Sequence, residues 1–249
     1  MSEARPSKQA IAARFGRAAG TYDAAAALQA EVAADLATRL ARLDLRPRTL
    51  LEFGCGTGAL TAPLARLWPG AWTVATDLAA PMVAACRRAG LGAAHLVMDA
   101  ERPALAGGTC DLVCGSLAAQ WFHDAPAALH RLQALLAPGG VLALTTLGPA
   151  SLQEWRAAQA AAGLAPTFLA YPGLDALRAA RRPDVRVLVE AAEQRQVTHP
   201  DAVAFLRGLA AIGADAAPGP GRLRRLLRAL PPGPVRTTYE VVILIWRRE

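Results

Sequence analysis

The sequence predicts an α/β fold built on a mostly parallel, doubly wound sheet. Short apolar segments of strand composition alternate with segments whose apolar residues recur every three or four positions. A glycine-rich turn directly follows the first of these strands. Strands that alternate with helices pair in parallel through right-handed crossovers. With 249 residues, 53% of them hydrophobic, the chain is long enough for one such domain with an elaborated end.

Five strands are expected in the first 147 residues, together with the helices that connect them. An amphipathic helix should precede them over 24–43, where apolar residues recur at helical spacing. Pro81 begins the helix after the second strand, where its missing N–H group is not needed. Leu129, Leu132 and Leu136 indicate another helix before the fifth strand. The expected strands lie over 49–53, 72–76, 96–97, 112–114 and 141–146.

The pattern changes after residue 147, where insertions are expected. The last apolar segment is rich in the strand-prone residues Val, Ile, Thr, Tyr and Trp. The expected elements are helices over 151–162, 174–181 and 201–212, and strands within 185–197 and 237–246. We predict a single domain, 1–249, with three parts: a helical cover over 1–47, a cofactor-binding core over 48–147, and substrate-side insertions with the last strands over 148–249.

The net charge of +7 comes almost wholly from arginine, because Lys8 is the only lysine among the 27 basic residues. Such a surface favours an acidic partner. A coding bias towards arginine and alanine is an alternative explanation of the same composition. No interleaving of basic and aromatic residues, helix-turn-helix pattern or zinc-finger spacing indicates a nucleic-acid partner.

The four cysteines lack the CxxC spacing of a zinc or redox site. We expect reduced, mostly buried thiols and no metal ion. The chain begins without the apolar segment of a secretory signal, and no apolar run approaches the roughly 20 residues that span a bilayer. These features predict a cytoplasmic protein with no membrane partner.

The glycine turn has the order Glu52-x-Gly54-x-Gly56-x-Gly58, with its third glycine one place earlier than in the dinucleotide-binding fingerprint. Residues without Cβ let the backbone approach a ligand at the carboxyl edge of a parallel sheet. S-adenosylmethionine has no pyrophosphate, but it carries an ammonium and a carboxylate group. Glu52 is a candidate acceptor for that ammonium, directly or through water. The alternative interpretation is a tight turn with a purely structural role.

Acidic residues follow the next two strands. Asp77 comes 77 − 54 = 23 positions after Gly54, and its carboxylate is able to accept hydrogen bonds from both hydroxyls of a ribose. Asp99, Ala100 and Glu101 are placed to recognise the adenine edge, and Ser116 ends the fourth strand near the methyl-donating region. The complete predicted cofactor-binding set is Glu52, Gly54, Cys55, Gly56, Thr57, Gly58, Asp77, Leu78, Met82, Asp99, Ala100, Glu101 and Ser116.

The motifs between residues 50 and 146 resemble, in order, those of the class I S-adenosylmethionine-dependent methyltransferases. This resemblance implies a Rossmann-like, seven-stranded and mostly parallel sheet with helices on both faces. It also implies N-terminal helices and a helical insertion near the C-terminus. The glycine spacing disfavours a nicotinamide-dependent dehydrogenase.

Further segments resemble the malonyl-[acyl-carrier protein] O-methyltransferase family of biotin synthesis. They are Phe15–Asp23, Ser116–Phe122, Thr146–Arg156, Ile212–Ala214 and Thr237–Val241. The resemblance implies methyl transfer from S-adenosylmethionine to the free carboxylate of a malonyl thioester. A carboxylate has a pKa of about 4 and is ionised at neutral pH, so no catalytic general base is expected.

For that reaction, the candidate anchor of the substrate carboxylate is Arg156, because a guanidinium binds a carboxylate through paired hydrogen bonds. Tyr22 is expected to cover the cofactor, and Trp121 to line the acyl channel. Each has an alternative interpretation: a solvated helix residue for Arg156, and core packing for Tyr22 and Trp121.

The implied partner is an acidic acyl carrier protein that bears malonyl-phosphopantetheine. Its candidate docking surface consists of Arg222, Arg224, Arg225 and Arg228, for which a solvated helix face is the alternative. Two competing functions stay open. One is a methyltransferase for a small free acid such as aconitate, and the other is an S-adenosylmethionine-binding regulator without turnover.

Overall fold

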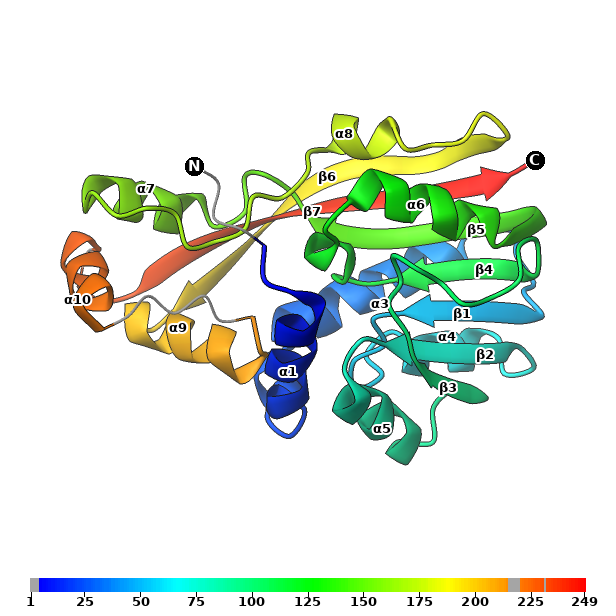
Figure 1. The fold of residues 1–249 in the computed structure, drawn as a ribbon, viewed down its shortest axis with the longest axis horizontal. Coiled ribbons are helices and arrows are strands. Elements are labelled where there is room, and N and C mark those ends of the chain that lie inside the picture. Colours follow the sequence, from blue (N-terminus) through cyan, green and yellow to red (C-terminus); the bar gives the residue numbers. More distant parts are fainter. Residues whose placement is uncertain (1–4, 215–219, 231) are drawn as a thin grey trace.

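The sheet contains seven strands in the order β3-β2-β1-β4-β5-β7-β6 (Figure 1). The computed structural model describes residues 5–214, 220–230 and 232–249. Pairing is parallel from β3 to β5 and antiparallel on both sides of β7. The predicted seven-stranded, mostly parallel sheet is thus confirmed. The strands are β1 (Thr49–Phe53), β2 (Trp72–Asp77), β3 (Ala94–Val97), β4 (Cys110–Gly115), β5 (Leu136–Leu147), β6 (Val185–His199) and β7 (Val235–Arg248).

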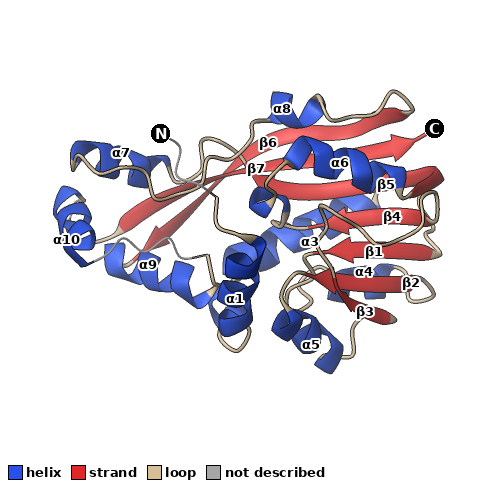
Figure 2. Ribbon diagram, viewed as in Figure 1, coloured by secondary structure: helices blue, strands red, loops and turns tan. Residues whose placement is uncertain are grey.

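Helices cover both faces of the sheet (Figure 2), because neighbouring residues of its central strands point to opposite sides. Leu50 and Leu112 are buried in one core cluster with residues of α3 and α4, whereas Leu51 and Val113 are buried in another with residues of α6 and α8. The helices are α1 (Lys8–Ala18), α2 (Tyr22–Ala25), α3 (Ala27–Ala41), α4 (Thr61–Leu67), α5 (Ala80–Arg88), α6 (Ala125–Ala134), α7 (Gln153–Ala161), α8 (Leu174–Arg178), α9 (Ala202–Ala211), α10 (Pro220–Ala229) and the 3-10 helix η1 (Ala119–Trp121).

The strand order reverses direction between β1 and β4, and this reversal positions the site. The chain passes from β1 through β2 to β3 on one side of that point, and from β4 to β5 on the other. The loops after β1 and β4 therefore diverge and leave a crevice at the carboxyl edge of the sheet.

Several element boundaries differ from those predicted. The helix expected over 24–43 is interrupted at Ala26, whose backbone leaves helical geometry between α2 and α3. Leu136 was assigned to a helix but begins β5, since α6 ends at Ala134. Strand β5 then runs through the turn-like Pro138-Gly139-Gly140 with a register shift against β4. Periodicity alone did not reveal that sheet pairing extends this far.

The antiparallel pair β6–β7 extends beyond the other strands, and α7, α9 and α10 pack around its far end (Figure 1). Trp155 of α7 is fully buried there and stacks on Phe205 of α9 with ring centroids 4.0 Å apart. Its indole Nε1–H donates to Thr237 Oγ1 of β7 over 3.0 Å. The indole thereby joins two helices of the C-terminal half to the sheet.

The described helices include none with the length and apolarity that a membrane span requires. The four cysteines are buried and free, as predicted.

Replacing Trp155 by alanine should lower the free energy of unfolding by about 3–5 kcal/mol, because the change removes a buried ring and leaves the Thr237 hydroxyl without its donor. Urea denaturation checks the value. Trp72→Ala is the control, because Trp72 is 59% exposed and its loss should change stability by about 0.5 kcal/mol or less. Equal losses in the two variants would contradict the assignment of Trp155 to the buried core.

Candidate functional site

A first cavity of about 680 Å³ lies at the carboxyl ends of the parallel strands. Its walls come from the loops after β1 to β4 and from α1 and α2 of the N-terminal cover. Ten predicted site residues line it: Tyr22, Gly54, Gly56, Asp77, Leu78, Met82, Asp99, Ala100, Ser116 and Trp121.

The glycine turn brings backbone to this cavity in conformations that favour glycine. Gly54 and Gly56 have φ angles of +66° and +53°, values that are strained for residues with a side chain. A Cβ atom on Gly54 would lie 2.4 Å from the Cβ of Ala118. Gly58 has a different role, because a Cβ there would lie 2.4 Å from Leu91 Cδ1. Two of the three glycines therefore border the cavity, and the third permits close packing.

Asp77 connects the turn after β1 to the turn after β2. Its Oδ2 accepts a hydrogen bond from the Gly56 N–H over 3.0 Å, and its Oδ1 accepts one from the Ala79 N–H over 2.8 Å. Burial raises the pKa of Asp77, and these backbone donors oppose the rise. Each carboxylate oxygen accepts more than one hydrogen bond, so Asp77 retains acceptor capacity towards the cavity.

Glu52 lies beneath the cavity and not on its wall. The side chain is buried, and Oε2 has no hydrogen-bond partner among the described residues. Burial raises the pKa of Glu52 to about 8, although a hydrogen bond from Thr61 opposes the shift. Cys55 and Thr57 also lie outside the lining, and the Thr57 hydroxyl donates to Asp23 of α2. The sequence correctly placed these residues in or next to the turn. It did not distinguish the residues that line the cavity, Gly54 and Gly56, from those that do not.

Lys8 is a lining residue that the sequence analysis did not select. Its Nζ lies 3.5 Å from Asp99 Oδ1 and 3.0 Å from Glu101 Oε2, so it ties α1 to the loop after β3. Glu101 also accepts from the Asp124 N–H over 3.0 Å and does not line the cavity. The one feature of the sequence that could have drawn attention to Lys8 is that it is the only lysine in a chain whose other basic residues are arginines.

A second cavity of about 610 Å³ adjoins the first and shares Phe15, Tyr22, Leu117 and Trp121 with it. The rings of Phe15 and Trp121 meet edge to face at 5.2 Å, so aromatic groups stand where the two spaces join. Phe15 was not selected as a site residue from the sequence. None of the described lining residues of the second cavity carries a formal charge: they are Phe15, Tyr22, Leu28, Gln29, Leu117, Gln120, Trp121, Leu147, Leu152, Phe168, Tyr171, Leu209, Ile212, Ala214 and Tyr239.

Arg156 lies behind the wall of the second cavity and lines neither space. Its guanidinium donates to the carbonyl oxygens of Ser151, Phe168 and Leu169, over 3.3, 3.4 and 2.6 Å. The guanidinium carbon is 5.8 Å from the centre of the Tyr171 ring. Its use as a carboxylate ligand stays a prediction.

The predicted docking arginines lie on α10. Arg224, Arg225 and Arg228 are exposed, and Arg225 Nη2 donates to the Ala162 carbonyl over 2.7 Å. The side chain of Arg222 falls outside the part of the chain whose side chains are described. Among the described residues, no cluster of three or more His, Cys, Asp or Glu side chains has an arrangement suited to a metal ion.

The buried carboxyl of Glu52 generates a pH-dependent prediction. Its folded pKa of about 8 exceeds the ordinary value of 4.5, so folding takes up a proton between these values and stability falls as pH rises through this window. Glu52→Gln removes this contribution. The stability of the variant relative to wild type should therefore rise from pH 5 to pH 8, by at most about 1.4 kcal/mol per pH unit. Urea denaturation at both pH values measures this change. The same difference in free energy of unfolding between variant and wild type at pH 5 and pH 8 would contradict the effect of burial on Glu52.

Comparison with known proteins relates this chain to methyltransferases by sequence and to a solved structure by fold. Residues 25–204 match the model of a family described as a methyltransferase domain. The biotin biosynthesis bifunctional protein BioCD of Bordetella avium is 42% identical over 96% of this chain, which spans about half (52%) of that protein's length. The YcgJ protein of Bacillus subtilis shares the fold, with a TM-score of 0.62, 12% identity and coverage of 86% of this chain and 98% of that one.

Two curated relatives match over almost their whole length. The malonyl-[acyl-carrier protein] O-methyltransferase of Magnetococcus marinus is 37% identical, with 96% of this chain and 92% of the relative covered. The protein of the same name from Dechloromonas aromatica is 34% identical, with 98% and 96% covered. The chain therefore belongs to the malonyl-[acyl-carrier protein] O-methyltransferase family.

Proposed function

We propose that this protein transfers a methyl group from S-adenosylmethionine to the free carboxylate of a malonyl thioester carried by an acyl carrier protein, in the cytoplasm. The product would be the methyl ester that primes pimeloyl synthesis on the route to biotin. Family membership supports the proposal. The structural observation that carries it is the pair of adjoining cavities, one with a glycine turn and a carboxylate, the other uncharged and largely apolar.

The first cavity suits the methyl donor. S-adenosylmethionine, when bound, supplies a methyl group on a positively charged sulfur. We assign its amino-acid end to the backbone of Gly54 and Gly56, whose positive φ angles turn the chain along the cavity wall, and its sugar hydroxyls to Asp77. Asp99 and Ala100 would hold the base. Glu52, beneath the turn, would accept a hydrogen bond from the ammonium through water.

The second cavity suits the acceptor. A malonyl carboxylate is already ionised at neutral pH and needs no base to become a nucleophile. The task of the protein is then to exclude water and to align the acceptor oxygen with the methyl group. Phe15, Tyr22 and Trp121 stand between the two spaces, where apolar rings would exclude water. Arg156 would attract the carboxylate by its positive charge behind Tyr171.

The carrier protein would dock through arginines. Arg224, Arg225 and Arg228 present exposed positive charge on α10, which packs on α7. Together with Arg222 they form the proposed docking surface, and opposite charge on a carrier protein would accelerate its encounter.

The proposed function is tested with purified protein and methyl-labelled S-adenosylmethionine. Malonyl-carrier protein, malonyl-coenzyme A and aconitate are offered as separate acceptors. The label should appear on malonyl-carrier protein, and alkaline hydrolysis should release it as volatile methanol, as expected of a methyl ester. Transfer to aconitate alone, or donor binding without transfer to any acceptor, would overturn the proposal.

Asp77→Ala should weaken binding of S-adenosylmethionine at least about tenfold, because the charged acceptor of two hydrogen bonds is lost. Isothermal titration calorimetry checks this affinity, and circular dichroism verifies that the variant is folded. The matched control is Asp175→Ala, which removes a carboxylate that is 94% exposed on α8. Unchanged affinity in a folded Asp77 variant would refute the donor placement.

A further inference from the structure

All three tyrosines of the chain, Tyr22, Tyr171 and Tyr239, line the second cavity. None of their hydroxyls makes a hydrogen bond to a described residue. Because these hydroxyls have no partner among the described residues and belong to residues that line one cavity, they are free to donate to a ligand bound there. The other lining side chains are apolar except for Gln29 and Gln120, and the Gln120 amide is already bonded to the Leu117 carbonyl over 2.5 Å.

We propose that the hydroxyls of Tyr171 and Tyr239 together bind the free carboxylate of the acceptor as uncharged hydrogen-bond donors. Arg156 is then a positioning residue that acts through Tyr171. This inference deepens the proposed function and rests on it, because it names the groups that would recognise the acceptor.

Both tyrosines keep their protons at neutral pH and therefore donate. Burial raises the pKa of Tyr171 to about 12, even though the positive charges of Arg156 and Arg5 oppose the rise. Burial also raises the pKa of Tyr239, and the neighbouring Tyr171 adds to that rise. Both rings line the same cavity, as shared binding of one carboxylate requires.

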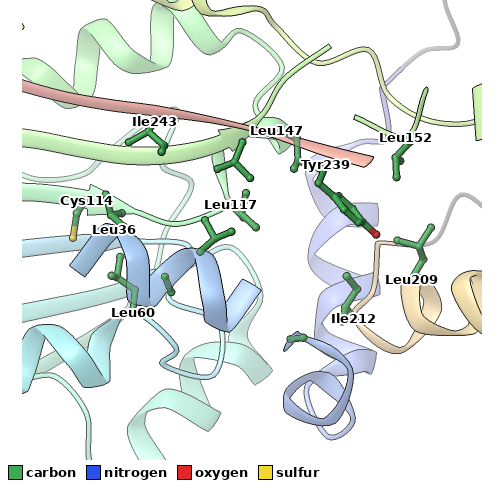
Figure 3. Packing of buried hydrophobic residues seen from close by; sticks show 14 of the residues in the cluster. Leu36, Leu60, Cys114, Leu117, Leu147, Leu152, Leu209, Ile212, Tyr239 and Ile243 are labelled. Atoms are coloured by element: carbon green, nitrogen blue, oxygen red, sulfur yellow. The ribbon is translucent and has the colours of Figure 1, made fainter. Parts of the chain in front are cut away.

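Fixed segments hold the two rings. Arg156 donates to the carbonyls of Phe168 and Leu169, and Arg5 Nη2 donates to that of Ala170 over 2.8 Å. Two arginines thus fix the backbone that leads into Tyr171. Tyr239 stands on β7, opposite Arg195 of β6. Figure 3 shows its hydroxyl directed away from the sheet towards Leu209.

Uncharged donors suit a carboxylate that must act as a nucleophile. A direct ion pair with arginine would stabilise the ionised ground state strongly in a low-dielectric space, and this stabilisation would be lost as the charge disappears on ester formation. Phenol hydroxyls also hold the carboxylate in place, but they stabilise its ionised form less than arginine does, so less stabilisation is lost when the ester forms. All three guanidinium nitrogens of Arg156 donate to carbonyl oxygens and the residue does not line the cavity, so its charge would assist from behind the wall.

Tyr171→Phe and Tyr239→Phe remove one hydroxyl each and keep the ring. Each change should raise the KM for malonyl-carrier protein about tenfold, with kcat changed less than threefold and donor affinity unchanged by calorimetry. The control is Thr38→Val, which removes an exposed hydroxyl from α3 that bonds only within its helix. A merely structural role would lower kcat and donor affinity together.

The double Phe variant should also lose the preference for malonyl- over acetyl-carrier protein when acetyl-carrier protein is used as a competitor. An unchanged KM and preference, in variants of a protein that methylates malonyl-carrier protein, would overturn the inference and leave the proposed function standing. Failure of the wild-type protein to methylate that acceptor would instead overturn the function itself.

A second measurement needs no substitution. Protein grown with 3-fluorotyrosine has three fluorine resonances, one for each tyrosine. Malonyl-carrier protein should shift the resonances of Tyr171 and Tyr239, and acetyl-carrier protein should shift them much less. Equal shifts with both carriers would show that the hydroxyls do not recognise the carboxylate.

Discussion

The hydrogen bond from the Gly56 N–H to Asp77 holds the site together. It joins the turns after β1 and β2 at the point where the strand order changes direction. The second oxygen of the same carboxylate fixes the start of the next turn at Ala79. Because the turn has positive φ angles at Gly54 and Gly56, the backbone itself forms part of the cavity wall. The position that we propose for S-adenosylmethionine, and for the acceptor beside it, depends on this arrangement.

A second constraint comes from the cover. The N-terminal helices contribute Phe15 and Tyr22 to both cavities, and Lys8 ties α1 to the loop after β3. The C-terminal insertions close the second cavity through α9 and the loop that carries Tyr171. An enclosure with few charges suits the proposed transfer of a methyl group from a positively charged sulfur to a negatively charged carboxylate. Water is excluded there and does not compete for either group. The extended β6–β7 pair provides the rigid base on which this enclosure is built.

The sequence predicted the parts of the molecule that depend on local pattern. The parallel strands, the glycine turn and Asp77 were all correctly located, because strand composition, glycine spacing and the position of an acid at a strand end are local signals. The second cavity was not predictable in the same way. Tyr171 and Tyr239 come from separate segments that meet only through the long β7 strand and the loop after α7. Arg156 also illustrates this limit, since its guanidinium binds carbonyls whose position depends on the path of that loop.

The most direct measurement is a crystal structure of the protein with S-adenosylhomocysteine, the demethylated donor, and a malonyl thioester bound together. The donor product should lie against Gly54 and Gly56 with its sugar on Asp77, and the malonyl carboxylate should lie in the second cavity, past Phe15 and Trp121. Density for the nucleoside away from Asp77, or for the malonyl group outside the second cavity, would contradict the two-cavity arrangement on which the proposed reaction depends.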